Sequence, residues 1–227
     1  MSEIVNQGNW GICGFVSVLN GLRAAGKLTK WTASGSVSFS LPEIQTRIYA
    51  EIVTYLKYLI FTRSPLLQQI EDISHLCKPK GETERSVADM VRFIEELLRG
   101  IGGKKGVAEK TMQTLIVEGV TEDFTIAMTP DSLLDYMTWA GVKNAKDLKV
   151  ETTQNTSDNL MIYTNCIIGL GERPGLRKYN GLEHWIYVTP DGVLNNWGEK
   201  TTLTPGKHGT DLFGKWARFI THVIRMA

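Results

Sequence analysis

The chain has 227 residues, of which 42% are hydrophobic, and its 25 lysines and arginines nearly balance its 24 aspartates and glutamates. This length and composition suit one domain with a sizeable core, or two small lobes that share a cleft. The balanced charge gives no indication of a nucleic-acid partner or of binding to an anionic membrane surface.

The first half of the chain predicts helices. Apolar residues recur at helical spacing over 13–25, and Pro42 suits the first turn of a long helix. A shorter helix is predicted to end near Leu76, and an amphipathic helix is predicted over 87–98. The stretch 29–40 is rich in serine, threonine and glycine, and we expect a loop there.

The second half predicts strands, with one further helix over 129–139. Apolar and alternating patterns predict strands at residues 124–128, 148–152, 160–170, 182–189, 193–197 and 219–226. Because Pro190-Asp191-Gly192 is a turn signal, we expect the strands on either side of it to pair as a hairpin. Helices followed by strands predict an α+β fold in one domain, with a helical lobe over about residues 1–120 and a β-rich lobe over about residues 121–227.

The termini and the cysteines narrow the class of protein. Residues 1–6 lack the basic and apolar regions of a signal peptide, and the longest apolar stretch, 55–61, is too short to span a bilayer. We therefore expect synthesis in the cytoplasm and no membrane span. Three widely spaced cysteines argue against a disulfide framework and against a zinc site. We interpret Cys77 and Cys166 as small buried hydrophobic residues.

Cys13 is the candidate nucleophile of the chain. It opens the first predicted helix after a glycine-rich turn, and Gln7 stands six residues before it. A helix N-terminus and a neighbouring imidazole both lower the pKa of a thiol, so we expect a lowered pKa at this cysteine. His184 begins a predicted strand, and Asn195 lies on its expected hairpin partner, where an amide is placed to hold the imidazole. Thiol, imidazole and amide make a nucleophile, its base and the group that orients the base.

Three short windows of the chain, residues 7–15, 182–188 and 195–198, resemble the papain-like cysteine peptidases. That family shows a glutamine, six positions later a cysteine that opens a helix, then a histidine, and then Asn-Ser-Trp-Gly. The resemblance implies a papain-like fold, in which a helical lobe carries the nucleophile and an antiparallel β lobe carries the histidine and the asparagine. Here Asn196 replaces the small hydroxyl residue; side-chain alternation lets only one asparagine face the histidine, and the spacing to the tryptophan favours Asn195.

The resemblance also implies a role for each residue of the site. The roles of oxyanion donor, nucleophile, base and orienting residue fall in that order to Gln7, Cys13, His184 and Asn195. Trp197 is implied as the cover that keeps water from the histidine and asparagine, and we expect Trp10 and Gly11 at the substrate-binding surface. No metal and no organic cofactor is implied.

The expected activity is that of a thiol hydrolase that cleaves peptide or amide bonds through an acyl-enzyme. Two alternatives use the same nucleophile and base: cleavage of stem-peptide amides in peptidoglycan, and acyl transfer by a transglutaminase-like deamidase. The complete set of four site residues argues against a non-catalytic binding module. Family members typically carry a long inhibitory pro-segment, whereas twelve residues precede Cys13. We therefore expect a bacterial effector or toxin, delivered out of the producing cell or restrained by a cognate inhibitor or immunity protein.

Overall fold

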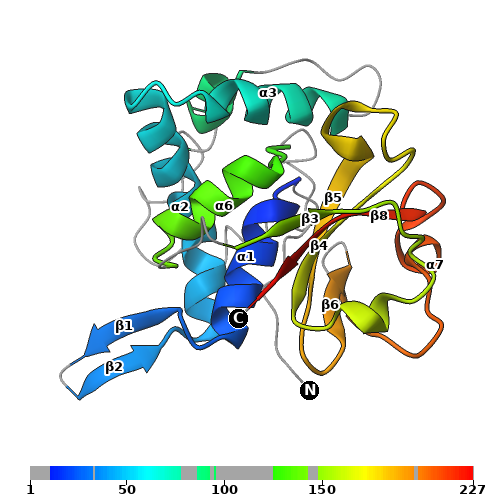
Figure 1. Ribbon diagram of the computed structural model, residues 1–227. Coiled ribbons are helices and arrows are strands. Elements are labelled where there is room, and N and C mark those ends of the chain that lie inside the picture. Colours follow the sequence, from blue (N-terminus) through cyan, green and yellow to red (C-terminus); the bar gives the residue numbers. More distant parts are fainter. Residues whose placement is uncertain are drawn as a thin grey trace.

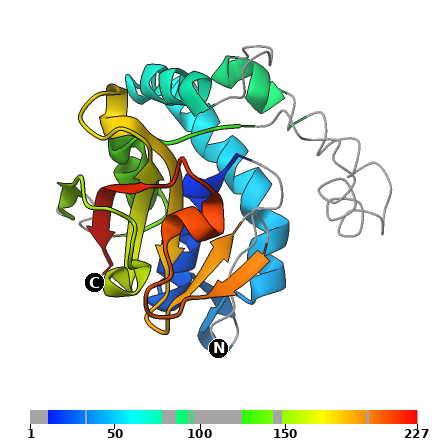
Figure 2. The same cartoon turned by 90° about the vertical axis from the view of Figure 1, so that its right-hand side faces the viewer.

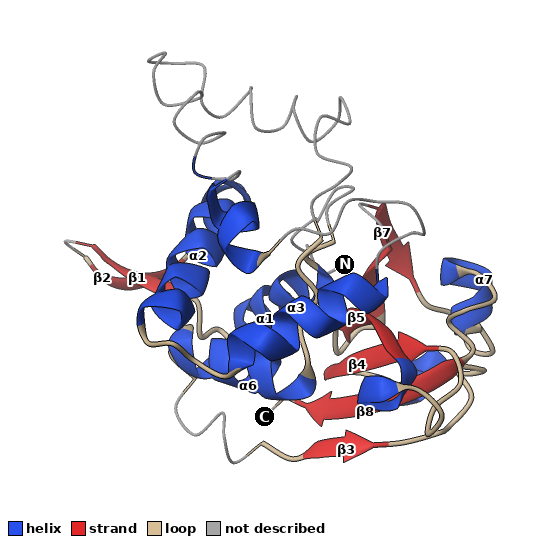
Figure 3. Cartoon of the chain, turned by 90° about the horizontal axis from the view of Figure 1, so that it is seen from above, coloured by secondary structure: helices blue, strands red, loops and turns tan. Residues whose placement is uncertain are grey.

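The computed structural model describes most of the chain, namely residues 11–32, 34–77, 86–92, 95, 125–142, 148–196 and 199–226. In this part the protein is a mixed α+β structure, which confirms the fold class expected from the sequence. The larger helices lie on one side of a four-stranded antiparallel sheet (Figure 1). Figure 3, seen from above, shows the helices and the sheet as two neighbouring layers. None of the described helices is both long and apolar enough to cross a membrane.

The helical layer is built from elements that the sequence patterns predict. Its bounds are α1 Cys13–Ala24, α2 Leu41–Phe61, α3 Leu66–Cys77 and α6 Pro130–Trp139. Helices α2 and α6 each begin at a capping box with a proline in the first turn. Helix α6 packs against α1 and α3, so helical packing extends beyond the lobe boundary expected near residue 120.

The strands form one sheet and two separate pairs. The sheet has the order β3 (Val150–Thr152), β8 (Phe219–Arg225), β4 (Cys166–Gly171) and β5 (Leu182–Val188), and all neighbours are antiparallel. The first separate pair is β1 (Thr29–Thr32) with β2 (Gly35–Ser38), and the second is β6 (Val193–Asn196) with β7 (Glu199–Thr202). Figure 2 shows β6 and β7, in orange, beside the sheet.

Buried apolar side chains cover both faces of the sheet. Along β5, Trp185 and Tyr187 belong to the core on the side of α1, whereas Ile186 and Val188 belong to a second core on the opposite face. The second core is closed by short helix α7 (Gly209–Phe213) and by the residues that follow it. Because β5 is packed on both faces, the side chain of His184 lies inside the protein.

Four predictions about the β structure are wrong in part. Within the expected loop over 29–40, residues 29–32 and 35–38 pair as the β1–β2 hairpin. Residues 160–163 form a 3-10 helix, η2 (Leu160–Tyr163), so the expected strand over 160–170 begins only at Cys166. Asn159 caps η2 by accepting the Met161 N–H, which favours a helical turn over an extended chain. In the expected strand over 124–128, Thr125 makes only an isolated bridge, and residues 126–128 join no sheet.

The expected pairing of β5 with β6 is the fourth correction. A turn does follow β5, with the Thr189 N–H donated to the Val193 carbonyl at 2.9 Å. Beyond this turn β6 pairs with β7, and among the described strands β5 lies at the edge of the sheet. Polar strand β7 carries no buried alternation, so the sequence pattern gave no sign of the partner that takes β6 away from β5.

Candidate active site

Cys13 is the first residue of α1, and its sulfur lies against the free edge of β5. The backbone N–H of Trp185 donates a hydrogen bond to Cys13 Sγ at 3.4 Å. Because β5 is an edge strand of the described sheet, the sulfur takes the position that a neighbouring strand would otherwise occupy. Only the His184 carbonyl carbon separates the Trp185 nitrogen from the His184 Cα, so the sulfur lies beside the base of the His184 side chain. His184 is thus the sequence neighbour of the residue that contacts Cys13 Sγ, and the pairing of its imidazole with the thiol stays a prediction.

Two glycines let the chain pack closely against the start of α1. A Cβ on Gly14 would lie 2.9 Å from the Met128 side chain, and a Cβ on Gly11 would lie 2.6 Å from the Thr125 side chain. Gly11 also accepts the Ile126 N–H at 3.0 Å. The structure therefore gives Gly11 a packing role, while its expected place at a substrate-binding surface stays a prediction.

His184 is buried, with only 2% of its surface exposed. The rings of Phe213 and Trp216 lie over its imidazole, with centroids 5.4 Å and 5.9 Å away. Removing the imidazole from water disfavours its charged form, and this burial lowers the pKa of His184 to about 3. The imidazole is therefore neutral at physiological pH and able to accept a proton.

Burial also controls the charge of the nucleophile. Cys13 is 6% exposed, and this burial raises the pKa of its thiol to about 11. The backbone N–H groups of Trp185, Gly14 and Cys13 itself act in the opposite direction, but the effect of burial is larger. The expectation of a lowered thiol pKa is wrong for this arrangement, because loss of hydration outweighs the helix N-terminus. Burial thus favours a neutral Cys13 thiol and a neutral His184 imidazole at rest.

Asn195 is buried on β6, at 9% exposure, and β6 contacts β5. The role of Asn195 as the orienting residue of His184 stays a prediction. Gln7, Trp10 and Trp197 lie outside the described residues, and so does the side chain of Asn196.

Cys77 contacts the same strand as Cys13. Its sequence context indicates only a small buried hydrophobic residue. It ends α3, and its S–H donates to the Glu183 carbonyl at 3.6 Å. Burial and the negative charge that Cys13 acquires on ionisation raise the pKa of Cys77 to about 12. The contact joins a helix and a strand that are far apart in the sequence, so no local pattern could have indicated it.

Ion pairs hold the segment before β5 at the border of the site. Arg177 Nη1 contacts Glu183 Oε1 at 2.8 Å, and Lys178 pairs with Asp72 of α3. Half-burial raises the pKa of the Glu183 carboxyl, while Arg177 opposes this change. The segment over 172–181 is thereby tied to α3 through Asp72.

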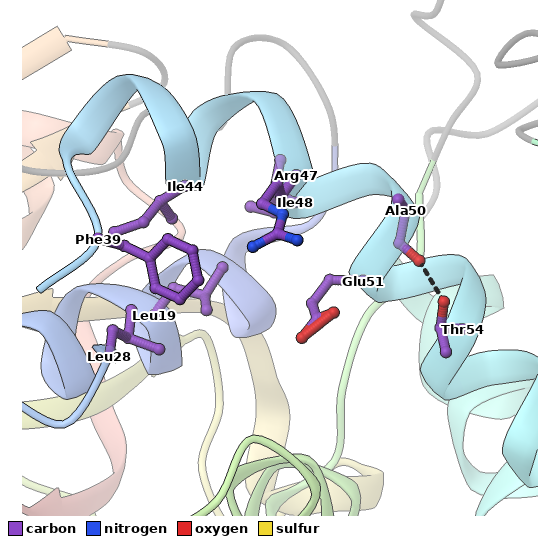
Figure 4. A pocket seen from close by; sticks show the side chains of 9 residues that line it. All are labelled: Leu19, Leu28, Phe39, Ile44, Arg47, Ile48, Ala50, Glu51 and Thr54. Carbon is purple, nitrogen blue, oxygen red and sulfur yellow. Dashed lines mark hydrogen bonds between the residues drawn. The ribbon is translucent and has the colours of Figure 1, made fainter. Parts of the chain in front are cut away.

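Two cavities lie elsewhere in the described part of the molecule. The first, of about 270 Å³, lies between α1 and α2 (Figure 4). Its walls are mostly apolar but include Glu51 and Thr54, and the Arg47 guanidinium lies 5.1 Å over the Phe39 ring. The second, of about 380 Å³, lies between the start of α6 and the sheet and is lined by polar residues that include His222. Neither cavity is lined by Cys13, His184 or Asn195.

The described residues contain no group of three or more histidine, cysteine, aspartate or glutamate side chains that could hold a metal ion. Comparisons of the chain with models of protein families, with curated proteins and with solved structures find no match. Support for a function therefore comes from the contacts and burial of Cys13 and His184.

Proposed function

We propose that the protein is a thiol hydrolase of papain-like architecture, which cleaves peptide or amide bonds through an acyl-enzyme on Cys13. The hydrogen bond from the Trp185 N–H to Cys13 Sγ carries this proposal. It holds a thiol at a helix N-terminus against the backbone next to a buried histidine, and this supports the pairing of a cysteine nucleophile with a histidine base. The substrate is a protein or peptide, or the stem peptide of peptidoglycan.

The reaction begins from the neutral pair. As Cys13 Sγ attacks the substrate carbonyl carbon, His184 takes the thiol proton, and the imidazolium then gives this proton to the leaving amine. Water, deprotonated by His184, releases the acyl group from the thioester. Proton transfer creates the anion and the imidazolium together, and their attraction in a site with little water offsets the cost of burying each charge.

The surrounding residues support this chemistry. The start of α1 presents the backbone N–H groups of Cys13 and Gly14 near the sulfur, where negative charge develops during attack. In this proposal Asn195 orients the imidazole, and Gln7 adds a donor to the oxyanion. Trp197 completes the cover over the imidazole to which Phe213 and Trp216 contribute.

Hydrolysis assays with a peptide library and with purified cell-wall sacculi test the proposal. We expect wild-type protein to cleave one of the two substrates, Cys13→Ala to lose at least about 1000-fold in rate, and Cys166→Ala to keep the wild-type rate. Cys166 is the matched control because it lies on β4 and contacts Thr164 and Arg225. Release of ammonia from protein glutamine, without cleavage, would support the acyl-transfer alternative. Equal activity of wild type and Cys13→Ala would contradict the proposal.

A further inference from the structure

Two cysteines from different helices contact the same short stretch of β5. Cys13 accepts the Trp185 N–H at 3.4 Å, and Cys77 donates to the Glu183 carbonyl at 3.6 Å. In an extended strand, the carbonyl of one residue and the N–H two positions later point to the same edge. The two sulfur atoms therefore lie next to each other along the free edge of β5, on either side of His184.

The two thiols also interact electrostatically. A negative charge on Cys13 raises the pKa of Cys77, and such an effect requires the two groups to be close. The carboxylate of Glu183 raises the pKa of Cys77 further. The backbone N–H groups of Trp185, Gly14 and Cys13 itself favour the thiolate of Cys13, whereas Cys77 donates to a carbonyl and faces the Glu183 carboxylate, so Cys13 is the first of the two to ionise. It is therefore the first to react with an oxidant, since the thiolate is the reactive form.

We propose that Cys77 is the resolving thiol of a reversible disulfide with Cys13, formed when a peroxide oxidises the site. The Cys13 thiolate attacks one oxygen of hydrogen peroxide, which forms an S–O bond, breaks the O–O bond and releases hydroxide. The Cys77 thiolate then attacks the sulfenic sulfur, which forms the S–S bond and releases a second hydroxide. The two thiol protons convert both hydroxides to water, so two thiols lose two electrons and one peroxide gains them.

The disulfide controls the nucleophile, and this regulation rests on the proposed function of Cys13. A sulfur held in an S–S bond cannot attack a carbonyl carbon, so oxidation stops hydrolysis. Thiol–disulfide exchange with a reducing thiol restores the free sulfur. Without Cys77 the sulfenic acid has no resolving partner, and further peroxide converts it to sulfinic and sulfonic acid, which simple thiols do not reduce.

Mass spectrometry tests the disulfide in wild-type protein, Cys77→Ser and Cys166→Ser. Each protein is treated with hydrogen peroxide at mildly alkaline pH, blocked with a maleimide, and analysed intact and as peptides. We expect wild type and Cys166→Ser to lose two hydrogen atoms, to yield a linked peptide pair containing Cys13 and Cys77, and to regain both thiols with dithiothreitol. We expect Cys77→Ser to gain two or three oxygen atoms on Cys13, which dithiothreitol does not remove.

Absence of the linked peptide pair, with the same oxygen additions on Cys13 in wild type and in Cys77→Ser, would overturn the inference. If Cys77→Ser does not fold, Cys13→Ala is used in its place. Its remaining cysteines should then form no reversible disulfide. The mass readout does not require turnover. A reversible disulfide in a protein that cleaves nothing would support the cysteine pair and contradict the hydrolase, whereas an active enzyme without the disulfide would contradict the pair alone.

Discussion

Burial of His184 makes the stability of the protein sensitive to acid. Its pKa is about 3 in the folded protein, against 6.5 for an exposed imidazole. Because the folded value is the lower one, the unfolded chain binds more protons between these pH values. The stabilisation is therefore fully present above pH 6.5 and is lost as the pH falls toward 3. Each pH unit in this window lowers the free energy of unfolding by about 1.4 kcal/mol. A change from about pH 7.5 to about pH 4.5 therefore removes on the order of 3 kcal/mol through this one residue.

Urea unfolding at these two pH values, in wild type and in His184→Gln, measures this contribution. The glutamine is uncharged at both pH values, so we expect the variant to lose on the order of 3 kcal/mol less than wild type on acidification. His222→Gln is a second variant with a similar expected effect, because burial lowers the pKa of His222 to about 4. His208→Gln is the exposed control. Equal acid losses in wild type and His184→Gln would refute the burial argument and, with it, the neutral resting pair.

Three further predictions concern the same region. The rate at which iodoacetamide alkylates Cys13 should rise about tenfold per pH unit. Because the pKa of Cys13 is about 11 and that of an ordinary cysteine is 9.0, alkylation of Cys13 at neutral pH should be about 100-fold slower than that of an exposed thiol. A plateau of the rate at acidic pH would instead indicate a preformed thiolate. Gly171→Ala should lower the free energy of unfolding by more than about 3 kcal/mol, because the added Cβ would lie 1.8 Å from the Gly181 carbonyl oxygen. An unchanged midpoint of urea unfolding would be incompatible with this packing. Trp185→Phe removes the 2.8 Å hydrogen bond from its indole to the Met128 carbonyl and should destabilise the protein by about 1–3 kcal/mol; a neutral substitution would show that water or another donor replaces the indole.

Local patterns were sufficient for the elements that carry the nucleophile and the base. Helix α1 has its apolar stripe and β5 its apolar run, and both match their expected ranges closely. The cap residues before α2 and α6 act within four residues of the helix start, which is the range at which a sequence pattern is informative. The position of Cys13 as the first residue of α1 follows from the same local signals.

Long-range contacts decided what the sequence could not indicate. The pairing of β6 with β7, in place of β5, depends on polar strand residues that have no apolar alternation. Cys77 reaches the site only because α3 ends against β5. The sign of the pKa change at Cys13 depends on how much protein surrounds the thiol, and a helix start alone does not specify that burial.

Formation of an acyl-enzyme on Cys13 distinguishes a nucleophilic cysteine from a buried structural thiol. Wild type and His184→Ala are mixed with an activated acyl ester, and intact mass and peptide mapping then follow the acyl group with time. We predict acylation of Cys13 at a rate about 100- to 10,000-fold higher in wild type than in His184→Ala, since a general base contributes factors of this size. Equal rates in the two proteins, or acylation of Cys77 or Cys166 in preference to Cys13, would contradict the account.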